Sequence, residues 1–405
     1  MMLGLCRKMV ALGGVLGGLC LPVQANTTAP EIPAPTSGAA QAPVAVPFAV
    51  DLSTTERLVR VGLVLPLQSE ILRGAAESVR DGFLAAHERE KDGVTVNIIE
   101  TSDVPQDTLA GYKNAAAQND IVVGPLSRTG VTALIQDGMV DRPTIALTQP
   151  DAGTPGEATP APVPHKLPPQ LLIMGLSIED EARQAADWAG KDKASKKAVV
   201  LFTKSAWQRR AAKAFEMQWQ HLGREVELVE LVANDGFLNG RALMQLQKQI
   251  QSDTPVVLFL ALDARQARQV RAIVGKDAVL YGTSQLNPVA LSDWQDADRT
   301  GDMDGTRLLD IPWQLQADHP AVMAYPRPVA EADQKRSADM ERLYALGIDA
   351  YRVARELALG RTGFELDGVT GKLTVRFDQK QTHFERTVQQ AIYRDGSVVP
   401  VGEAR

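Results

Sequence analysis

The sequence predicts an α/β protein made of two Rossmann-like lobes, each with a parallel sheet, around a central cleft. Short apolar runs alternate with Ala-rich, amphipathic segments of helix length. This alternation is typical of parallel sheets that are covered by helices on both faces. Two such sets, of similar size, are joined by more than one Pro-rich crossing. The chain of 405 residues is long enough for two lobes and a large core.

In the first set, each apolar run ends in small or polar residues, which marks the carboxyl end of a strand. The segments between the runs carry apolar side chains at helical spacing. The predicted strands are Val59–Leu65, Val94–Glu100, Ile121–Gly124 and Thr144–Leu147, and the predicted helices are Arg73–Glu90, Asp107–Asn119 and one that begins near Ser127 or Thr129.

The second set follows residues 151–169, a Pro-rich loop or lobe crossing. Residues 317–334 are again Pro-rich and predict a second crossing. A capping box that starts at Ser177 opens the first helix. The predicted helices run from there to Ala189 and over Ala206–Leu222, Asn239–Gln251, Ala264–Val274 and Met340–Leu359. The predicted strands are Ala198–Thr203, Val226–Leu231, Val256–Leu262, Val279–Gly282, Leu308–Ile311 and a closing pair, Val369–Phe377 with Thr387–Tyr393.

The amino terminus predicts export. Arg7 and Lys8 precede an apolar run, and Val23-Gln24-Ala25 matches a small-x-small cleavage site. The predicted organisation is a signal peptide over residues 1–25, a Pro/Ala-rich linker over 26–57, lobe 1 over 58–172 and 320–365, and lobe 2 over 173–319 and 366–400.

Both cysteines, Cys6 and Cys20, lie inside the predicted signal, so the mature chain is expected to contain no disulfide. Cys20 suggests a lipoprotein acylation site as an alternative, but the bulky Leu19 precedes it. Cleavage after Ala25 is therefore favoured. No apolar run is long enough to predict a membrane span.

Several functional classes lack their sequence signals. The formal net charge of −6 argues against a nucleic-acid partner. The five histidines are scattered, which leaves no metal-ligand cluster. Neither a nucleophile elbow nor a Gly-rich phosphate loop is present. We therefore expect no cofactor, no metal and no catalytic residue.

Candidate ligand-binding residues lie at the carboxyl ends of the predicted strands, where open α/β sheets bind ligands. Backbone N–H groups in the turn that starts at Gly124 can bind an anion. The candidates are Gln68, Ser69, Gly124, Pro125, Ser127, Arg128, Thr148, Gln149, Trp207, Asp263, Thr283, Ser284, Gln285 and Trp313.

These candidates also have simpler structural interpretations. The turn after Gly124 is equally consistent with a helix start that is capped by Ser127 or Thr129. Trp207 and Trp313 either line the cleft or plug the lobe interface. Phe215 and Trp219, at helical spacing, are expected in the core.

Longer motifs resemble known families. Leu63–Leu67 followed by Arg80–Phe83 resembles the start of type I periplasmic binding proteins of the branched-chain amino-acid class. A closer resemblance, over about residues 58–400, is to the LpoA/LppC-type penicillin-binding-protein activators. It is carried by Val123–Leu126, Ala146–Pro150, Leu176–Ala186, Trp207–Arg210, Gln266–Arg268, Tyr281–Asn287, Asp310–Trp313 and Arg342–Tyr351.

The resemblance implies a type I periplasmic-binding-protein-like fold and a non-catalytic regulator that stimulates a bifunctional peptidoglycan synthase, a penicillin-binding protein. It places the protein in the periplasm, at the periplasmic face of the outer membrane. Larger family members carry an all-helical domain where only the linker is seen here, and they are lipoproteins. The alternative is a solute-binding protein that delivers a small polar ligand, such as an amino acid or peptide, to a transporter or sensor. Relative to the amino-acid-binding proteins that the chain resembles, the neutral Gln285 stands where an acidic partner for the ligand's ammonium is expected.

Overall fold

The computed structural model describes residues 58–91, 93–151, 167–192, 195–234, 236–252, 256–290, 301–328, 337–377 and 382–402. The predicted signal peptide, Cys20 and the linker lie outside these residues, as do most of the Pro-rich segment 151–169 and residues 329–336. The chain divides into residues 1–54 and a compact unit over residues 55–405. Only the second unit is described below.

The first sheet confirms the predicted parallel α/β arrangement. Within the described residues its strands run in the order β2-β1-β3-β4-β5, and every pair is parallel. Its strands are β1 (Val59–Leu65), β2 (Val94–Glu100), β3 (Ile121–Val123), β4 (Thr144–Ala146) and β5 (Leu171–Ile173), and its helices are α1 (Arg73–Arg89), α2 (Pro105–Gln118) and α3 (Arg128–Asp137).

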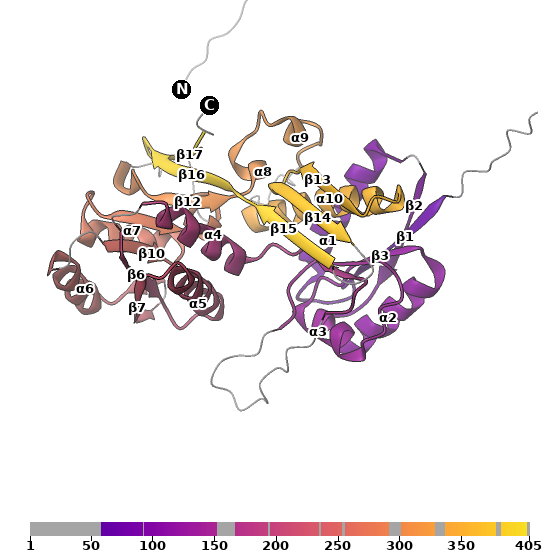
Figure 1. Cartoon of the computed structure of the whole chain (residues 1–405), viewed down its shortest axis with the longest axis horizontal. Coiled ribbons are helices and arrows are strands. Elements are labelled where there is room, and N and C mark those ends of the chain that lie inside the picture. Colours follow the sequence, from indigo (N-terminus) through magenta and orange to yellow (C-terminus); the bar gives the residue numbers. More distant parts are fainter. Residues whose placement is uncertain are drawn as a thin grey trace, which may run out of the picture. The chain divides into compact units, whose positions relative to one another are not determined.

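The second sheet has the order β17-β16-β12-β11-β10-β6-β7 (Figure 1). Its parallel part comprises β6 (Lys197–Phe202), β7 (Glu225–Glu230), β10 (Val256–Leu260), β11 (Val279–Gly282) and β12 (Arg307–Asp310). The antiparallel strands β16 (Gln389–Arg394) and β17 (Ser397–Pro400) extend it. Its helices are α4 (Ile178–Gly190), α5 (Ala206–His221), α6 (Gly240–Ser252) and α7 (Ala264–Val274), and a short hairpin joins β8 (Ala233–Asn234) to β9 (Phe237–Leu238).

The predicted closing β pair is wrong. Strand β14 (Lys372–Phe377) pairs with β13 (Gly363–Asp367) and β15 (Thr382–Thr387) in a separate antiparallel sheet. Strand β16 instead pairs with β12 and β17. Only Val388 separates β15 from β16, and Figure 1 shows the two strands following one another from one sheet into the next.

Helix α10 (Ala338–Ala358) packs against α1 through glycines. A Cβ atom on Gly82 would collide with the carbonyl oxygen of Tyr344, and one on Gly347 would collide with the carbonyl oxygen of Val79. The helices approach so closely because neither position carries a side chain. Two short helices, α8 (Pro312–Leu315) and α9 (Pro320–Met323), lie between β12 and α10 in the sequence.

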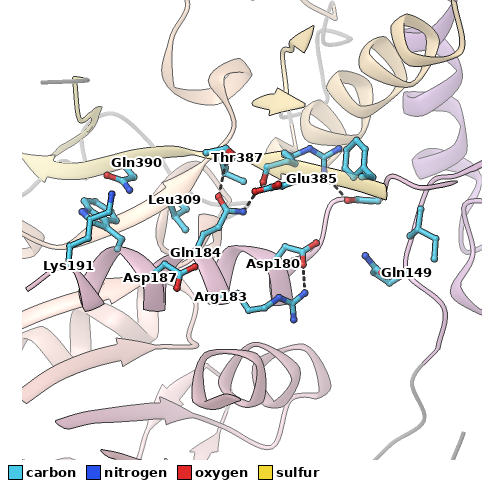
Figure 2. Close-up of a pocket in the computed structure, with 16 residues that line it drawn as sticks. Gln149, Asp180, Arg183, Gln184, Asp187, Lys191, Leu309, Glu385, Thr387 and Gln390 are labelled. Carbon is cyan, nitrogen blue, oxygen red and sulfur yellow. Dashed lines mark hydrogen bonds and ion pairs between the residues drawn. The ribbon is translucent and has the colours of Figure 1, made fainter. Parts of the chain in front are cut away.

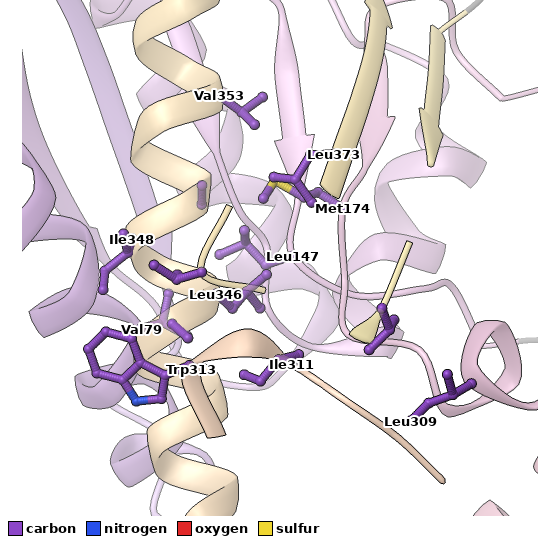
Figure 3. Packing of buried hydrophobic residues seen from close by; sticks show 14 of the residues in the cluster. Val79, Leu147, Met174, Leu309, Ile311, Trp313, Leu346, Ile348, Val353 and Leu373 are labelled. Carbon is purple, nitrogen blue, oxygen red and sulfur yellow. The ribbon is translucent and has the colours of Figure 1, made fainter. Parts of the chain in front are cut away.

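The main hydrophobic core draws side chains from both large sheets. Figure 3 shows Met174, which follows β5, beside Leu373 of β14, and Leu147, which follows β4, beside Leu346 of α10. Ile311 and Trp313, which follow β12, belong to the same cluster. Trp313 is completely buried. Phe215 and Trp219 are also fully buried and stack with ring centroids 5.6 Å apart, which confirms their predicted place in the core.

Candidate functional site

Two of the predicted ligand-binding side chains, Ser127 and Asp263, form helix caps, and Ser69 stabilises the turn that precedes α1. The Ser69 hydroxyl accepts a hydrogen bond from the backbone N–H of Leu72 just before α1, at 3.0 Å. Ser127 caps α3 by accepting from Gly130 at 3.1 Å. Asp263 opens α7 in a capping box with Gln266. These side chains satisfy N–H groups at helix starts, which would otherwise lack partners.

The turn after β3 is held tightly. Gly124 has a φ of +114°, and a Cβ atom there would collide with the carbonyl oxygen of Val64. Together with the Ser127 cap, this geometry supports the simpler of the two interpretations of the turn, a capped start to α3. Pro125 is buried in the same turn.

Arg128, the residue after Ser127, forms an ion pair that links α3, which packs with the first sheet, to α4, which packs with the second. Its guanidinium lies 3.4 Å from Glu179 of α4, and the guanidinium of Arg210 from α5 lies 2.8 Å from the same carboxylate. Burial opposes ionisation of Glu179, but its own backbone N–H and the two arginines outweigh burial and lower the pKa of this carboxyl. One internal carboxylate therefore occupies both arginines.

Glu181, two residues further into α4, is buried at the end of β11. Its Oε2 accepts a hydrogen bond from the backbone N–H of Ser284 at 2.8 Å. Burial, reinforced by the charge of Asp310, raises the pKa of Glu181 to about 7, although the hydrogen bond from Ser284 and the charge of Arg342 act in the opposite direction. The carboxyl therefore titrates near neutral pH.

Arg342 of α10 connects the same region to β12. Its guanidinium forms a two-pronged ion pair with Asp310, at 2.7 and 3.1 Å, and donates to the carbonyl oxygen of Ser284 at 3.3 Å. Asn287 also donates to Oδ2 of Asp310, at 2.8 Å. Burial alone would lower the pKa of Arg342, but Asp310 outweighs burial and raises it. These contacts fix the amino end of α10 against the second sheet.

Trp313 and Thr283 are completely buried. The Trp313 ring packs against Tyr344 with centroids 5.4 Å apart and lies 4.2 Å from the guanidinium carbon of Arg327. This placement agrees with a packing role for Trp313. The Thr283 hydroxyl has no hydrogen-bond partner among the described residues.

Other predicted residues remain near solvent. Gln68 is exposed, whereas Trp207 and Gln285 are half-buried. Thr148 is half-buried, and its backbone lies so close to Gly175 that a Cβ atom there would approach the Thr148 Cα to 2.5 Å. The segment that leaves β5 therefore runs directly against the loop after β4.

Gln149 alone among the predicted residues lines the pocket in Figure 2, a depression of about 400 Å³. One wall is a face of α4 with Asp180, Arg183, Gln184 and Asp187, and the opposite wall is the strand run from β15 to β16. Gln184 joins the walls, because its amide donates to the carbonyl oxygen of Arg386 at 2.9 Å and accepts from the N–H of Val388 at 3.0 Å.

Arg386 is buried beneath this pocket. It donates to the carbonyl oxygens of Gly175 at 2.7 Å and Met174 at 3.0 Å, and to the hydroxyl of Thr370 at 3.1 Å. Burial lowers the pKa of Arg386 to about 10. The guanidinium thus ties the end of β15 to the segment that leaves β5.

Within the described part of the chain, no group of three or more His, Cys, Asp or Glu side chains is placed to hold a metal ion. Nor does any described helix have the length and apolar character needed to cross a membrane.

A family model described as "LppC putative lipoprotein" matches residues 26–396. The chain belongs to this family. Penicillin-binding protein activator LpoA of Haemophilus influenzae is 25% identical over 352 residues, which cover 84% of this chain and 55% of that protein. The Edwardsiella piscicida LpoA is 27% identical over 365 residues, with coverages of 80% and 48%. The chain thus spans about half the length of these curated relatives.

Solved structures share the fold of this LppC family member. The LpoA C-domain of Haemophilus influenzae, described as a regulator of PBP1A, has a TM-score of 0.63 and 23% identity, and the match covers 85% of this chain and all of that one. A "putative branched-chain amino acid ABC transporter" of Chromobacterium violaceum has a TM-score of 0.61 and 32% identity over 83% of this chain and all of that one. The type I periplasmic-binding-protein-like fold is therefore confirmed.

Sequence reasoning missed the charged residues that organise this region of the LppC family member: Glu179, Glu181, Arg210, Asp310, Arg342 and Arg386. Glu179 and Glu181 lie in the helix start that begins at Ser177, but that pattern was interpreted only as a capping box. Asp310 and Arg342 lie within motifs that carry the family resemblance. Their pairing joins residues far apart in the chain, so no local pattern signals it.

Proposed function

We propose that this protein is a non-catalytic activator of a penicillin-binding protein, a bifunctional peptidoglycan synthase. The observation that carries the proposal is the LppC family match over residues 26–396, together with relatives that are named penicillin-binding protein activators. The polar groups at the strand ends also favour a regulator. Glu179, Glu181 and Asp310 are engaged by partners within the chain.

The proposed activation is a coupling between binding and the conformation of the synthase. In this mechanism a surface of the domain binds the synthase and favours its active state. The internal bridges, such as the pair of arginines on Glu179, keep that surface in one arrangement before the partner arrives. Pre-ordering of this kind reduces the entropy that is lost on binding.

The test uses the full chain and the purified synthase of the same organism. Glycan polymerisation and peptide crosslinking are measured on lipid-linked precursor, with and without the chain. We expect both binding and a higher rate of at least one reaction. A solute-binding protein of the same fold serves as the control and should leave both rates unchanged. Absence of binding together with unchanged rates would contradict the proposal.

We also propose export to the periplasm and attachment at the inner face of the outer membrane. The family description as a lipoprotein supports attachment through Cys20, although the sequence around Cys20 favours simple cleavage after Ala25. Fractionation of cells that express the chain or its Cys20→Ser variant distinguishes acylation of Cys20 from cleavage after Ala25. Acylation predicts that the wild type follows the outer membrane and the variant becomes soluble, whereas cleavage after Ala25 predicts no difference.

The second candidate function is the capture of a small polar solute. The Chromobacterium violaceum structure, described as a "putative branched-chain amino acid ABC transporter", favours it at 32% identity. A thermal-shift screen with amino acids and short peptides tests it. A ligand at 100 times its dissociation constant should stabilise the fold by about 2.7 kcal/mol. Clear stabilisation by one solute would favour this candidate over the activator.

A further inference from the structure

A second depression, of about 450 Å³, lies at the carboxyl end of α4. Trp188 and Lys191 line both this depression and the pocket of Figure 2, so the two are neighbours along the same helix. We name the combined surface the α4 groove. It runs along the α4 face from Asp180 to Lys191, opposite β15 and β16 and ending near Gly402.

The far end of the α4 groove is cationic although the chain as a whole is acidic. Lys191, Arg307 and Arg394 line it, whereas Asp192 is the single acidic residue that lines it among the described residues. Lys191 and Arg394 are exposed, and neither forms an ion pair with a described residue. Asp192 is itself engaged, because it accepts a hydrogen bond from Ser195 at 3.3 Å.

Arg307 is held in place by aromatic side chains. Its guanidinium carbon lies 5.2 Å from the centre of the Tyr281 ring and 6.0 Å from that of Trp188, and one N–H donates to the Tyr281 hydroxyl. A guanidinium has five N–H donors. The aromatic contacts therefore orient Arg307 and leave donors for a carboxylate.

The carboxyl end of a helix is partly negative and would normally repel an anion. Here Arg224 binds the carbonyl group of Gly190, the last residue of α4, and two carbonyl groups of the segment that follows the helix. Its guanidinium donates to the carbonyl oxygens of Gly190 at 2.5 Å, Asp192 at 3.0 Å and Ser195 at 2.5 Å. This cation offsets the helix end, so Lys191 and its cationic neighbours dominate the charge of the groove.

The length of the groove indicates the size of its occupant. The face from Asp180 to Lys191 spans about 16 Å at 1.5 Å per helical residue. An extended peptide rises about 3.3 Å per residue, so about five residues fit along it. The mixed charges nearer Gln149 suit a polar segment, and the far end suits acidic side chains.

We propose that the α4 groove binds an extended, acidic peptide segment of a partner protein, with the acidic side chains against Lys191, Arg307 and Arg394. Identification of this partner as the synthase rests on the proposed function. The proposal that the groove binds an acidic segment does not rest on the proposed function, because it is argued from the groove itself.

The first experiment measures binding of a fluorescein-labelled Glu-Glu-Leu-Glu-Glu peptide to the full chain by anisotropy at low salt. The comparison peptide replaces every Glu by Gln. We expect the acidic peptide to bind about tenfold more tightly than its neutral analogue. The double variant Lys191→Glu/Arg394→Glu should weaken this binding by about tenfold.

The matched control is Lys204→Glu/Lys248→Glu, which changes the net charge equally at exposed positions outside the groove. It should retain the affinity of the wild type, and circular dichroism checks that both variants fold. Equal binding of the two peptides, no saturable binding, or equal losses in the two double variants would overturn the proposal.

The second experiment repeats the synthase assay with both double variants. If the segment belongs to the synthase, the groove variant loses stimulation and the control variant keeps it. Full stimulation by the groove variant would remove the synthase as the partner. If the wild type itself gives no stimulation, the proposed function fails. The peptide measurement still tests whether the groove binds an acidic segment.

Discussion

Glu181 differs from the other buried carboxylates of the region in the kind of group that contacts it. Asp310 faces Arg342 directly at 2.7 Å, and Glu179 lies between two arginines. Glu181 instead accepts its hydrogen bond from the neutral backbone N–H of Ser284. Desolvation therefore dominates, and the pKa rises to about 7.

This raised pKa predicts a pH dependence of stability. The unfolded chain ionises Glu181 near its ordinary value of 4.5, whereas the folded chain does so only near 7. The contribution of Glu181 to the free energy of unfolding is thus complete below about pH 4.5, and it falls by about 3 kcal/mol as the pH rises to about 7. Glu181→Gln removes this dependence. Urea unfolding at pH 5 and pH 8 should show that the variant gains on the wild type at the higher pH, and a constant difference between the two proteins would contradict the assignment.

The carboxylate of Glu179 serves two arginines, so its removal affects both. We expect Glu179→Ala to lower the free energy of unfolding by about 1–2 kcal/mol, because Arg128 and Arg210 then lose their partner while partly buried. Glu88→Ala, which breaks an exposed pair with Lys91, is the control and should change stability little. In a double-mutant cycle, Arg128→Ala should cost less in the Glu179→Ala background. Additive losses would mean that the bridge carries no energy.

At the scale of elements, the contact between α1 and α10 depends on two glycines. Gly82→Ala should destabilise the fold by about 1–3 kcal/mol, because the added methyl group collides with the backbone of Tyr344. Gly74→Ala, in the same helix, is the matched control. Nothing lies within 4 Å of its added methyl group, so it should stabilise by about 0.5–1 kcal/mol. Thermal unfolding measures both, and equal shifts would show that the helices separate easily.

Strands and helices with strong local patterns were predictable from the sequence. Strand β1 and helix α7 occupy the ranges expected from their apolar spacing. The partners of β14 and β16 were not predictable. Both strands alternate polar and apolar residues, and the local sequence does not specify which strand each one pairs with. The short strands β5 and β13 adjoin Pro- and Gly-rich segments, which hid their pattern.

The candidate site was predicted only in outline. Arg128 and Gln149 lie where strand ends and loops meet α4, as expected for such an edge. Ser127 and Asp263 cap helices and Ser69 stabilises the turn before α1, roles that the sequence cannot distinguish from ligand binding. The acidic and basic partners come from distant segments, and only the folded chain brings them together.

At the scale of the whole molecule, buried hydrogen bonds connect segments that cross between the sheets. Arg386→Met leaves the carbonyl oxygens of Gly175 and Met174 without these donors inside the protein. The expected loss is about 3 kcal/mol, typical of breaking a buried charged network. Arg376→Met, on the exposed face of β14, is the control and should have a small effect. Chemical unfolding followed by tryptophan fluorescence makes the comparison. Similar losses in both variants would indicate that these crossing bonds contribute little.

The single residue between β15 and β16 also restricts how the chain length can vary. Side chains along a strand alternate between faces, so one inserted residue reverses every later position. An insertion beside Val388 would turn the buried Ala391 and Tyr393 towards the opposite face. It would also displace the N–H of Val388, from which Gln184 accepts a hydrogen bond. Insertions and deletions are therefore tolerated at this point only if they preserve the alternation on both sides. The connection thus fixes the register of β16 in the seven-stranded sheet relative to that of β15 in the three-stranded sheet.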